Sequence, residues 1–381
     1  MAHTRSGTLK ANLSGGTSYE SFVPAPLPPN PPIKFDEELS MALVKASGQL
    51  SIMNSFTQQE SVKMFIPMLA RREALASCEM EGFQATIEDI LDPYWDYKYN
   101  NGSVCSVVEL FVETMEFTCG KLSRHPISND LLKNAHALLT GGTRGQNPGV
   151  FRMSQNWIGD PGCGLENARY IPPNPEDMQT AIKELETYIN EPDSATMHPL
   201  IKAALVHYQF EAIQPFLEEN DRIGRLLIIW LLILKSRLPS APALGMSCYF
   251  KKHQEEYYER LEDVRKRGAF EEWAKFFLKA VVKSSQDSCI RLLKLSLLHT
   301  KNYALLNKMP NPAAAKIVFS YIEKHPIAEA QMVAEDLRKD ERSVLPILHG
   351  FLDNGILGFK GDFNDIRFIY NAFLDILREE P

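Results

Sequence analysis

The stretch Ile213-Gln214-Pro215-Phe216-Leu217-Glu218-Glu219-Asn220-Asp221-Arg222-Ile223-Gly224-Arg225 is a polar loop between two apolar segments. Before it, Ile201, Leu205 and Tyr208 recur at the three-and-four spacing of one helix face. Pro215 ends that helix, because the residue before a proline is pushed out of the helical region. After it, residues 226–234 are apolar without a break, which predicts a helix that runs through a core. This helix–loop–helix therefore decides the fold.

The loop has the features of an anion site. With Asn220 and Gly224 it opens the second helix, so backbone N–H groups and the positive end of the helix dipole point at whatever lies in front. Arg222 and Arg225 add two guanidinium groups suited to phosphate oxygens. Glu218 is placed to hold a divalent metal that bridges such phosphates. The alternative is a solvated connection between two helices of a buried bundle.

These residues resemble the signature loop of Fic proteins, which reads His-Pro-Phe-x-[Asp/Glu]-[Gly/Ala]-Asn-[Gly/Lys]-Arg-x-x-Arg. The matching positions are Pro215, Phe216, Glu218, Asn220, Arg222 and Arg225. Three positions depart: Gln214 stands where the family has His, Glu219 where it has a small residue, and Asp221 where it has Gly or Lys. The resemblance implies a mainly α fold, with a Fic-type helical core, a small β-hairpin flap and a C-terminal winged-helix-like domain.

The resemblance also implies a reaction, in which the loop binds ATP and Mg²⁺ and AMP passes to a hydroxyl side chain of a target protein. In the family the His takes the proton from that hydroxyl, and Gln214 cannot, because a carboxamide has no basic lone pair near neutral pH. Losing a general base typically costs roughly 10²–10⁴-fold in rate. We therefore predict an adenylyltransferase-type protein with impaired transfer, whose catalytic positions are Gln214, Arg222 and Arg225. The alternative is a non-catalytic interaction or regulatory protein on a Fic scaffold that acts through its C-terminal domain.

The nucleotide positions implied by the resemblance lie in three parts of the chain. They are Glu218, Glu219, Asn220, Asp221, Arg222, Gly224 and Arg225 in the loop, Ile158 and Gly159 in the flap, and Tyr257 and Tyr258 after the core, with Glu218 as the metal ligand. Three carboxylates in the loop oppose a polyphosphate unless a metal neutralises them. Tyr258 is placed to stack on the base, although an aromatic residue at helical spacing is more often plain core.

An inhibitory segment is predicted upstream, where residues 71–82 end a helix at Gly82, a residue type suited to the position after a helix C-terminus. Ser77 and Glu81 lie four apart and share a face. Together the three resemble the inhibitory helix of Fic proteins, [Ser/Thr]-x-x-x-Glu-[Gly/Asn], in the class where it precedes the core. The resemblance implies that Glu81 pairs with Arg225 and keeps the γ-phosphate from seating. The alternative is an exposed helix end with a surface carboxylate.

A hairpin is predicted where Gly, Pro and Asn cluster around Val150-Phe151-Arg152 and Gln155-Asn156-Trp157-Ile158, which indicate two short strands. It resembles the family's flap, which docks a stretch of the target protein by strand addition. The alternative is that Phe151 and Trp157 fill a gap in the core. His207, which lies upstream of Gln214, is expected to be a structural hydrogen-bonding residue rather than a base.

Four parts are predicted along the chain. They are a Pro-rich extended arm over residues 1–35, an N-terminal helical region with the inhibitory helix over 36–130, a Fic core over 131–300 and a winged-helix-like domain over 301–381. Residues 312–381 hold eight Lys and Arg against twelve Asp and Glu, and Pro346 is expected to interrupt the helix that would read DNA. Contact with a protein, or a homodimer, is therefore expected rather than DNA binding.

Composition sets the remaining limits. The 381 residues carry a net charge of −7, which argues against general binding to nucleic acid or to an anionic membrane. Six scattered cysteines without a CxxC spacing indicate reduced thiols in a cytoplasmic protein. The first residues are polar, so no export signal is expected.

Overall fold

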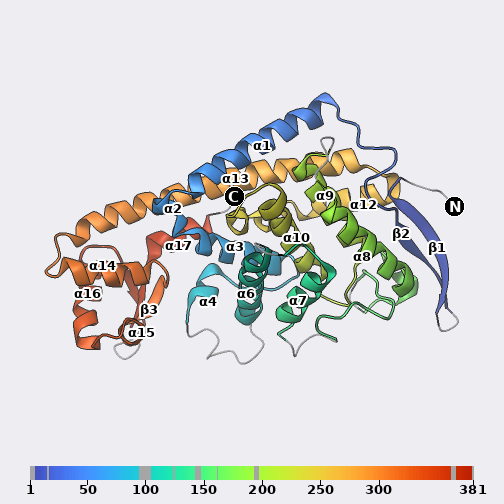
Figure 1. The fold of residues 1–381 in the computed structure, drawn as a ribbon. Helices are drawn as coiled ribbons and strands as arrows, with labels where there is room; N and C mark the ends of the chain where they lie inside the picture. Colours follow the sequence, from blue (N-terminus) through green and yellow to red (C-terminus); the bar gives the residue numbers. More distant parts are fainter. Residues whose placement is uncertain are drawn as a thin grey trace.

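The computed structural model describes residues 5–14, 17–93, 104–122, 125–141, 147–160, 162–192, 197–361 and 366–379. Across these ranges the chain is mainly helical with small antiparallel sheets, as predicted (Figure 1). The first elements are β1 (Gly7–Ser14), β2 (Thr17–Pro24), α1 (Glu37–Thr57), α2 (Glu60–Lys63), α3 (Ile66–Glu79) and α4 (Ile87–Leu91). The central ones are α6 (Val104–Leu122), α7 (Asn129–Leu139), η1 (Leu165–Asn167), α8 (Pro175–Asn190), α9 (Pro199–Ile213), α10 (Asn220–Lys235), η2 (Ala241–Ala243), α11 (Met246–Lys252) and α12 (Gln254–Arg267). The last are α13 (Phe270–Leu306), α14 (Pro312–Ile322), β3 (Ile327–Glu329), α15 (Ala330–Asp336), α16 (Glu341–Asp353), β4 (Gly358–Lys360), β5 (Arg367–Ile369) and α17 (Asn371–Arg378).

Helices α9 and α10, which flank the signature loop, lie in the centre of the body (Figure 1). All residues of α9 from Leu200 to Ile213 are buried, and so are those of α10 from Arg222 to Leu232. Helix α10 is tied to α6 by the Trp230 ring N–H, which donates to the Thr118 hydroxyl at 3.0 Å. The apolar run after the loop therefore forms the buried helix that its composition predicted.

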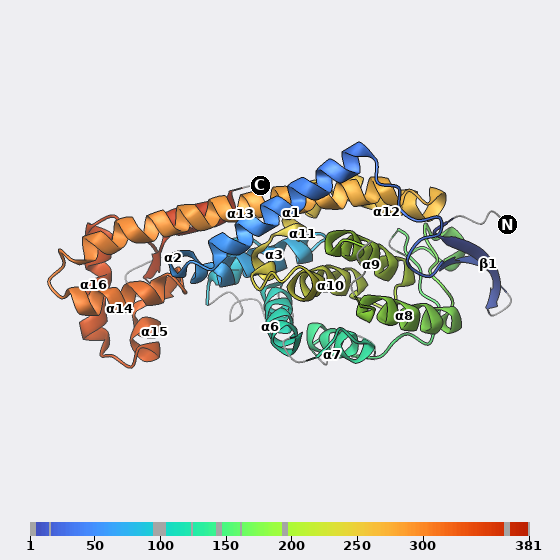
Figure 2. The ribbon, with the colours of Figure 1, turned by 45° about the horizontal axis from the view of Figure 1, so that its top comes forward.

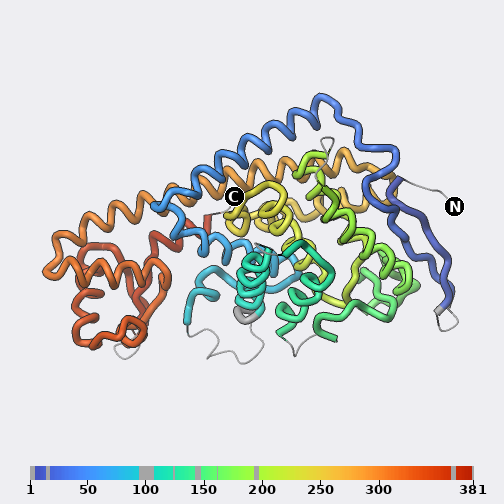
Figure 3. Tube along the Cα trace, viewed as in Figure 1, coloured from blue at the N-terminus to red at the C-terminus, as the bar shows by residue number. Residues whose placement is uncertain are grey.

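Helix α13 spans the molecule and joins its two ends (Figure 2). Its 37 residues correspond to about 55 Å at 1.5 Å per residue. Helix α1 packs along it, the β1–β2 hairpin lies near its beginning, and the C-terminal elements gather at its far end (Figure 3). None of the described helices is both long and apolar enough to span a bilayer.

The N-terminal region differs from the predicted extended arm, because β1 and β2 pair as an antiparallel hairpin from Gly7↔Pro24 to Ser14↔Thr17. No proline precedes Pro24, so both strands keep the N–H groups that a ladder requires. Phe22 is buried, and its N–H donates to the Ile171 carbonyl at 2.9 Å. Only residues 25–35 form the proline-rich extension.

The C-terminal elements follow the order α14, β3, α15, α16, β4, β5, α17, with sheet order β3-β5-β4. The winged-helix assignment of this part stays a prediction. The expected break at Pro346 is wrong, because α16 continues through it from Glu341 to Asp353. The apolar face of this helix, with Val344, Leu348 and Phe351 buried, compensates for the one backbone hydrogen bond that proline removes.

A cluster of charged residues, termed here the C-terminal clamp, joins α17 to the body. Arg72 of α3 donates to the Leu377 carbonyl at 3.1 Å and to Asp287 of α13 at 3.0 Å. Arg291 of α13 donates to the same Asp287 carboxylate at 2.8 Å and also to the backbone carbonyls of Ile376 and Glu379. The end of the chain is therefore held by two arginines that lie on different helices.

Candidate active site

The signature loop is held in one conformation by its own side chains. Helix α9 ends at Gln214, whose φ of 48° is left-handed, and Pro215 cannot continue the helix. Asn220 then closes the loop: its Oδ1 accepts from the Phe216 N–H at 2.9 Å, and its Nδ2 donates to the Phe216 carbonyl at 2.9 Å. The Phe216 ring is buried and stacks on His136 at 4.0 Å between centroids.

The segment expected to form the flap supports this loop instead of forming two paired strands. The Arg152 backbone N–H donates to the Pro215 carbonyl at 2.9 Å, and its buried guanidinium donates to the Gln214 carbonyl at 2.8 Å. Residues 150–152 and 155–157 form no strand, and the N–H that a ladder would need at Arg152 is bonded to Pro215, so the predicted hairpin between 150–152 and 155–158 is wrong. The β-bridge formed here joins Ile158 to Tyr170.

Of the two aromatic side chains considered for a core role, the Phe151 ring is buried and packs on Phe216, 5.1 Å away. The Trp157 side chain remains 42% exposed, so it does not fill the core. Arg152 was not predicted as a site residue, because nothing in the sequence distinguishes a buried arginine from a solvated one.

On what we call the arginine side of the loop, Glu81 lies between two guanidinium groups. Its Oε1 accepts from Arg225 Nη2 at 2.7 Å, and its Oε2 lies 2.9 Å from Arg222 Nε. Ser77 adds its hydroxyl, which accepts from Arg225 Nε at 2.6 Å, and its carbonyl, which accepts from Arg225 Nη2 at 3.0 Å. Gly82 follows with a φ of 87°, as suits the end of the helix. The structure thus contains the Glu81–Arg225 pair that the resemblance implied, whereas its inhibitory role stays a prediction.

A second carboxylate, Glu219, also forms an ion pair with Arg222. Burial raises the pKa of Glu219 to about 7, against the opposing charge of Arg222. Burial lowers the pKa of Arg225, but the charges of Glu81 and Asp221 outweigh it, and the net shift is upward. Two arginines therefore face carboxylates supplied by the protein itself.

Unsatisfied donors remain on this side. The Nη1 atoms of Arg222 and Arg225 are buried and form no hydrogen bond within the described ranges. Glu219 is the residue before the first turn of the 16-residue helix α10, and its side chain accepts no hydrogen bond from the first backbone N–H groups of that helix. Buried guanidinium donors beside an uncapped helix N-terminus fit phosphate oxygens, provided that Glu81 moves aside.

On the opposite side, which we call the carboxamide side, Gln214 lies between two acids. Its Nε2 is 3.3 Å from Glu211 Oε2 and 3.5 Å from Asp221 Oδ1, which are long hydrogen bonds. Glu211 is only 9% exposed, and its Oε1 has no partner within the described residues. A Cβ on Gly224 would lie 2.1 Å from that oxygen, so the absence of a side chain at 224 leaves room for the carboxyl. Burial raises the pKa of Glu211 well above its usual range, and the Asp221 charge adds to the shift.

The carboxamide side opens into a groove of about 530 Å³. Its lining includes Ile158, Arg169, Tyr170, Tyr208, Glu211, Gln214, Asp221, Glu255, Tyr258, Glu259 and Arg265. Ile158 and Tyr258 of the expected nucleotide positions therefore face this space. Gly159 does not line it, and a Cβ there would lie 2.4 Å from Cys163 Sγ, so this glycine serves close packing.

Tyr257 lies in the core and not in the groove, since it is 1% exposed and packs on Phe250 at 4.8 Å between centroids. Its hydroxyl is 2.8 Å from His207 Nε2, and His207 Nδ1 is 2.9 Å from the Gly224 carbonyl. Because that carbonyl only accepts, Nδ1 carries the proton and Nε2 accepts from Tyr257. Burial lowers the pKa of His207 to about 4. His207 is thus structural, as expected, and the predicted contact of Tyr257 with a nucleotide is not supported by its position.

Glu218, the expected metal ligand, is exposed, and no described residue forms a hydrogen bond or ion pair with its carboxylate. In the part of the chain that the structure describes, no three acidic, His or Cys side chains form a metal cluster. Mg²⁺ commonly binds through one or two carboxylates together with substrate phosphates. A single exposed carboxylate, two residues before the helix that carries Arg222 and Arg225, fits that mode.

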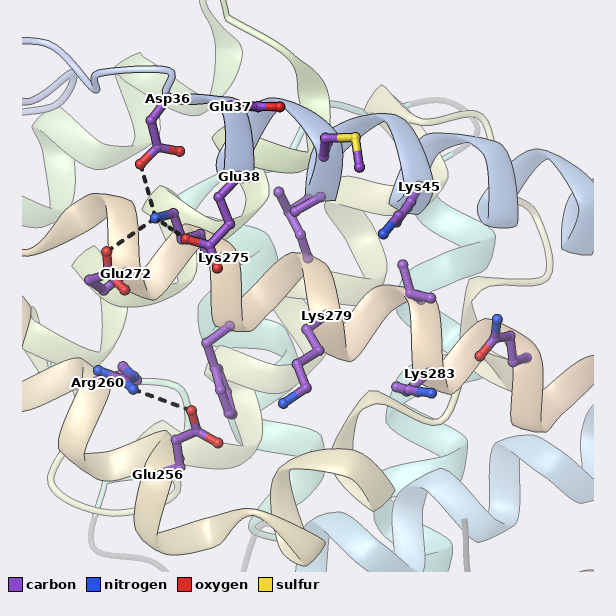
Figure 4. A pocket seen from close by; sticks show the side chains of 16 residues that line it. Asp36, Glu37, Glu38, Lys45, Glu256, Arg260, Glu272, Lys275, Lys279 and Lys283 are labelled. Carbon is purple, nitrogen blue, oxygen red and sulfur yellow. Dashed lines mark hydrogen bonds and ion pairs between the residues drawn. The ribbon is translucent and has the colours of Figure 1, made fainter.

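A larger hollow, of about 960 Å³, lies elsewhere, between α1, α12 and α13 (Figure 4). Lys275 at its edge contacts Asp36 at 3.0 Å and Glu38 at 2.7 Å, which ties α13 to the beginning of α1. No residue of the signature loop lines it, so this hollow is separate from the chemistry of the loop.

Comparison with known proteins agrees with this geometry. Residues 126–232 match the model of the Fic/DOC family, and residues 40–117 match that of the Fic/DOC family N-terminal region. The chain belongs to the Fic/DOC family. The first match contains the signature loop, and the second contains the helix that carries Ser77 together with Glu81. The two matches therefore cover both halves of the contact on the arginine side.

Curated relatives of this Fic-family chain include the protein adenylyltransferase Fic of Drosophila melanogaster, which is 36% identical over 85 residues. That match covers 22% of this chain and 15% of the fly protein. The protein of the same name from Culex quinquefasciatus is 32% identical over 114 residues, 30% of this chain and 20% of the mosquito protein. The matched part is thus a small fraction of these relatives.

Solved structures show the same fold. A Fic family protein from Desulfovibrio desulfuricans superposes with a TM-score of 0.58 at 17% identity and covers 89% of this chain and 97% of its own. Fic-1 from C. elegans superposes with a TM-score of 0.51 at 18% identity over 68% of this chain and 73% of its own. At these identities the likeness concerns the fold alone.

Proposed function

We propose that this Fic-family chain is a nucleotide-binding protein of the adenylyltransferase type, which transfers AMP from ATP to a hydroxyl of a target protein and is held inactive by Glu81. The observation that carries the proposal is the position of Glu81 across Arg222 and Arg225, beside two buried Nη1 atoms without partners. A carboxylate in this place is a substitute for a phosphate, since both present anionic oxygens to a guanidinium.

In this proposal the two arginines and the first turn of α10 bind the phosphates, and Asn220 keeps the loop in shape through Phe216. Mg²⁺, held by Glu218 and the phosphates, would supply charge neutralisation. The groove on the carboxamide side receives the hydroxyl of the target protein, because it is the open space next to the position of the family's base. Ile158 lines this groove, and its backbone N–H and carbonyl are both bonded to Tyr170.

Binding is tested by calorimetry with ATP and Mg²⁺ on the wild type and on Glu81→Gly. We expect little heat from the wild type and clear binding by the variant, because the substitution removes the one carboxylate that faces both guanidinium groups. Glu79→Gln, at the end of the same helix, is the matched control, since Glu79 contacts Lys251 and not the loop. Absence of binding by Glu81→Gly would overturn the proposal and favour a non-catalytic Fic scaffold.

Transfer is tested with α-labelled ATP on Glu81→Gly/Gln214→His, which restores the family's base. Labelling of a protein by this double variant, above that of the wild type, is the expected result. If the double variant binds ATP but labels nothing, including itself, the AMP-transfer part of the proposal fails while nucleotide binding stands.

A further inference from the structure

Two departures from the family signature lie next to each other in space. Gln214 and Asp221 are seven residues apart in the sequence, but Gln214 Nε2 is 3.5 Å from Asp221 Oδ1. The same amide nitrogen lies 3.3 Å from Glu211 Oε2. The carboxamide thus connects two carboxyl groups at the position where the family has its base.

The Glu211 carboxyl is an independent sign that this place handles a proton. It is more than nine-tenths buried, its Oε1 has no hydrogen-bond partner in the described part of the chain, and it lines the groove. Because residue 224 is a glycine, no side chain fills the space that this oxygen occupies. A carboxyl without a cationic contact in such a place prefers its protonated form, and a second carboxyl nearby strengthens that preference.

We propose that Asp221 is the proton acceptor that replaces the missing histidine, with Gln214 and Glu211 as its positioning residues. This inference rests on the proposed AMP transfer. Gln214 donates to both carboxyl groups and holds them side by side, which a carboxamide can do although it cannot take up a proton itself. Glu211 keeps its own proton, because burial and then the charge of Asp221 raise its pKa, so the proton of the target hydroxyl does not pass to Glu211.

The step is balanced without further reactants. The target hydroxyl oxygen forms a bond to the α-phosphorus of ATP, the bond from that phosphorus to the bridging oxygen of the β-phosphate breaks, and pyrophosphate leaves. The hydroxyl proton passes to the Asp221 carboxylate. Asp221 lies in the first turn of α10 and lines the groove, so it faces both the phosphate seat and the space for the hydroxyl.

The substitution at 221 is therefore interpreted as a compensation for the substitution at 214. In the family signature position 221 is Gly or Lys, neither of which provides a carboxylate. A carboxylate here has a cost, since it repels the phosphates of ATP. The acid thus makes two opposite contributions, weakening ATP binding and supplying a base, and they can be measured separately.

The test uses the full chain with Glu81→Gly as background, so that ATP can bind. Asp221→Asn in that background should lower the rate of labelling from α-labelled ATP by about 10²–10⁴-fold, the usual contribution of a general base. ATP affinity measured by calorimetry should stay equal or rise. Asp221→Glu should retain part of the activity, and Glu79→Gln, an acid outside the groove that contacts Lys251, is the matched control.

The positioning residues are tested by rescue. Glu211→Gln and Gln214→Ala should each lower kcat without weakening ATP binding, with thermal unfolding as the check on folding. Adding Gln214→His to Asp221→Asn should restore labelling, because a histidine no longer needs the carboxylate. A merely structural role for Asp221 would give no such rescue.

The outcomes separate the two proposals. If the Glu81→Gly background binds ATP and labels only after Gln214→His is added, or if Asp221→Asn labels as well as its background, the role of Asp221 is overturned and the proposed function stands. If the Glu81→Gly background does not bind ATP at all, the proposed function fails, and the role of Asp221 fails with it.

Discussion

The two sides of the signature loop differ in which charged groups they bring together. On the arginine side, Arg222 and Arg225 are nearly fully buried and face the carboxylates of Glu81 and Glu219, so that opposite charges meet. On the carboxamide side, Glu211 and Asp221 meet across an uncharged amide and open into a groove. The first side is thus closed by attraction between opposite charges, whereas the second brings two carboxyl groups together beside an open groove.

The largest effect is expected on the closed side. Arg225→Met should lower the free energy of unfolding by about 3–5 kcal/mol, because it removes the donor of three hydrogen bonds to Ser77 and Glu81 and leaves the half-buried Glu81 with Arg222 alone. Urea unfolding measures the change. Arg267→Met, which breaks an exposed pair, should cost less than about 1 kcal/mol. Equal costs for the two would mean that the closed side is not stabilised as described.

The next effect concerns His207, which lies behind the loop. Burial lowers the pKa of His207 from 6.5 to about 4. Between these two pH values the imidazole is therefore protonated in the unfolded chain and neutral in the folded chain. Stability should therefore fall as the pH falls through this window, by about 3 kcal/mol from this group. Urea unfolding at several pH values measures the slope, and His207→Asn should reduce it. An unchanged slope in the variant would contradict the burial of a neutral ring.

A smaller effect is expected where the carboxamide side meets α10. Gly224→Ala brings a methyl group against Glu211 Oε1 and should cost about 1–3 kcal/mol through overpacking. Glu211→Ala removes the obstructing carboxyl, so a double-mutant cycle should show a coupling between the two positions. Additive costs would show that the carboxyl does not occupy this space.

The smallest effect separates the two acids on the arginine side. Glu219→Gln removes one negative charge beside Arg222 and should raise ATP affinity by about 2–5-fold in the Glu81→Gly background, the size expected for a partly exposed ion pair. Calorimetry measures the change. A gain as large as that from Glu81→Gly itself would mean that Glu219, and not Glu81, is the principal inhibitory contact.

Much of this arrangement could be predicted from the sequence, because its signals are local. The apolar run after Gln214 predicted the buried α10, and the spacing of Ser77, Glu81 and Gly82 predicted the end of α3. The hairpin of residues 7–24 was not predicted, because the prolines that follow it indicate an extended chain and its own strands are mostly polar. The expected strands near Arg152 failed because its backbone N–H pairs with Pro215, more than 60 residues away, and no local pattern reports such a contact. Tyr257 and Tyr258 are adjacent in the sequence, yet only the packing of α12 decides which of them faces the groove.

The C-terminal clamp has a mechanical consequence. Arg72 lies at the middle of α3, and Glu81 lies just beyond its last turn, so this one helix contacts both α17 and, through Glu81, Arg225 of the signature loop. A tilt of α3 that withdraws Glu81 must either break the hydrogen bonds of Arg72 to α17 and α13 or move those two helices with it. A displacement of α17 would therefore be transmitted through α3 to the contact between Glu81 and Arg225.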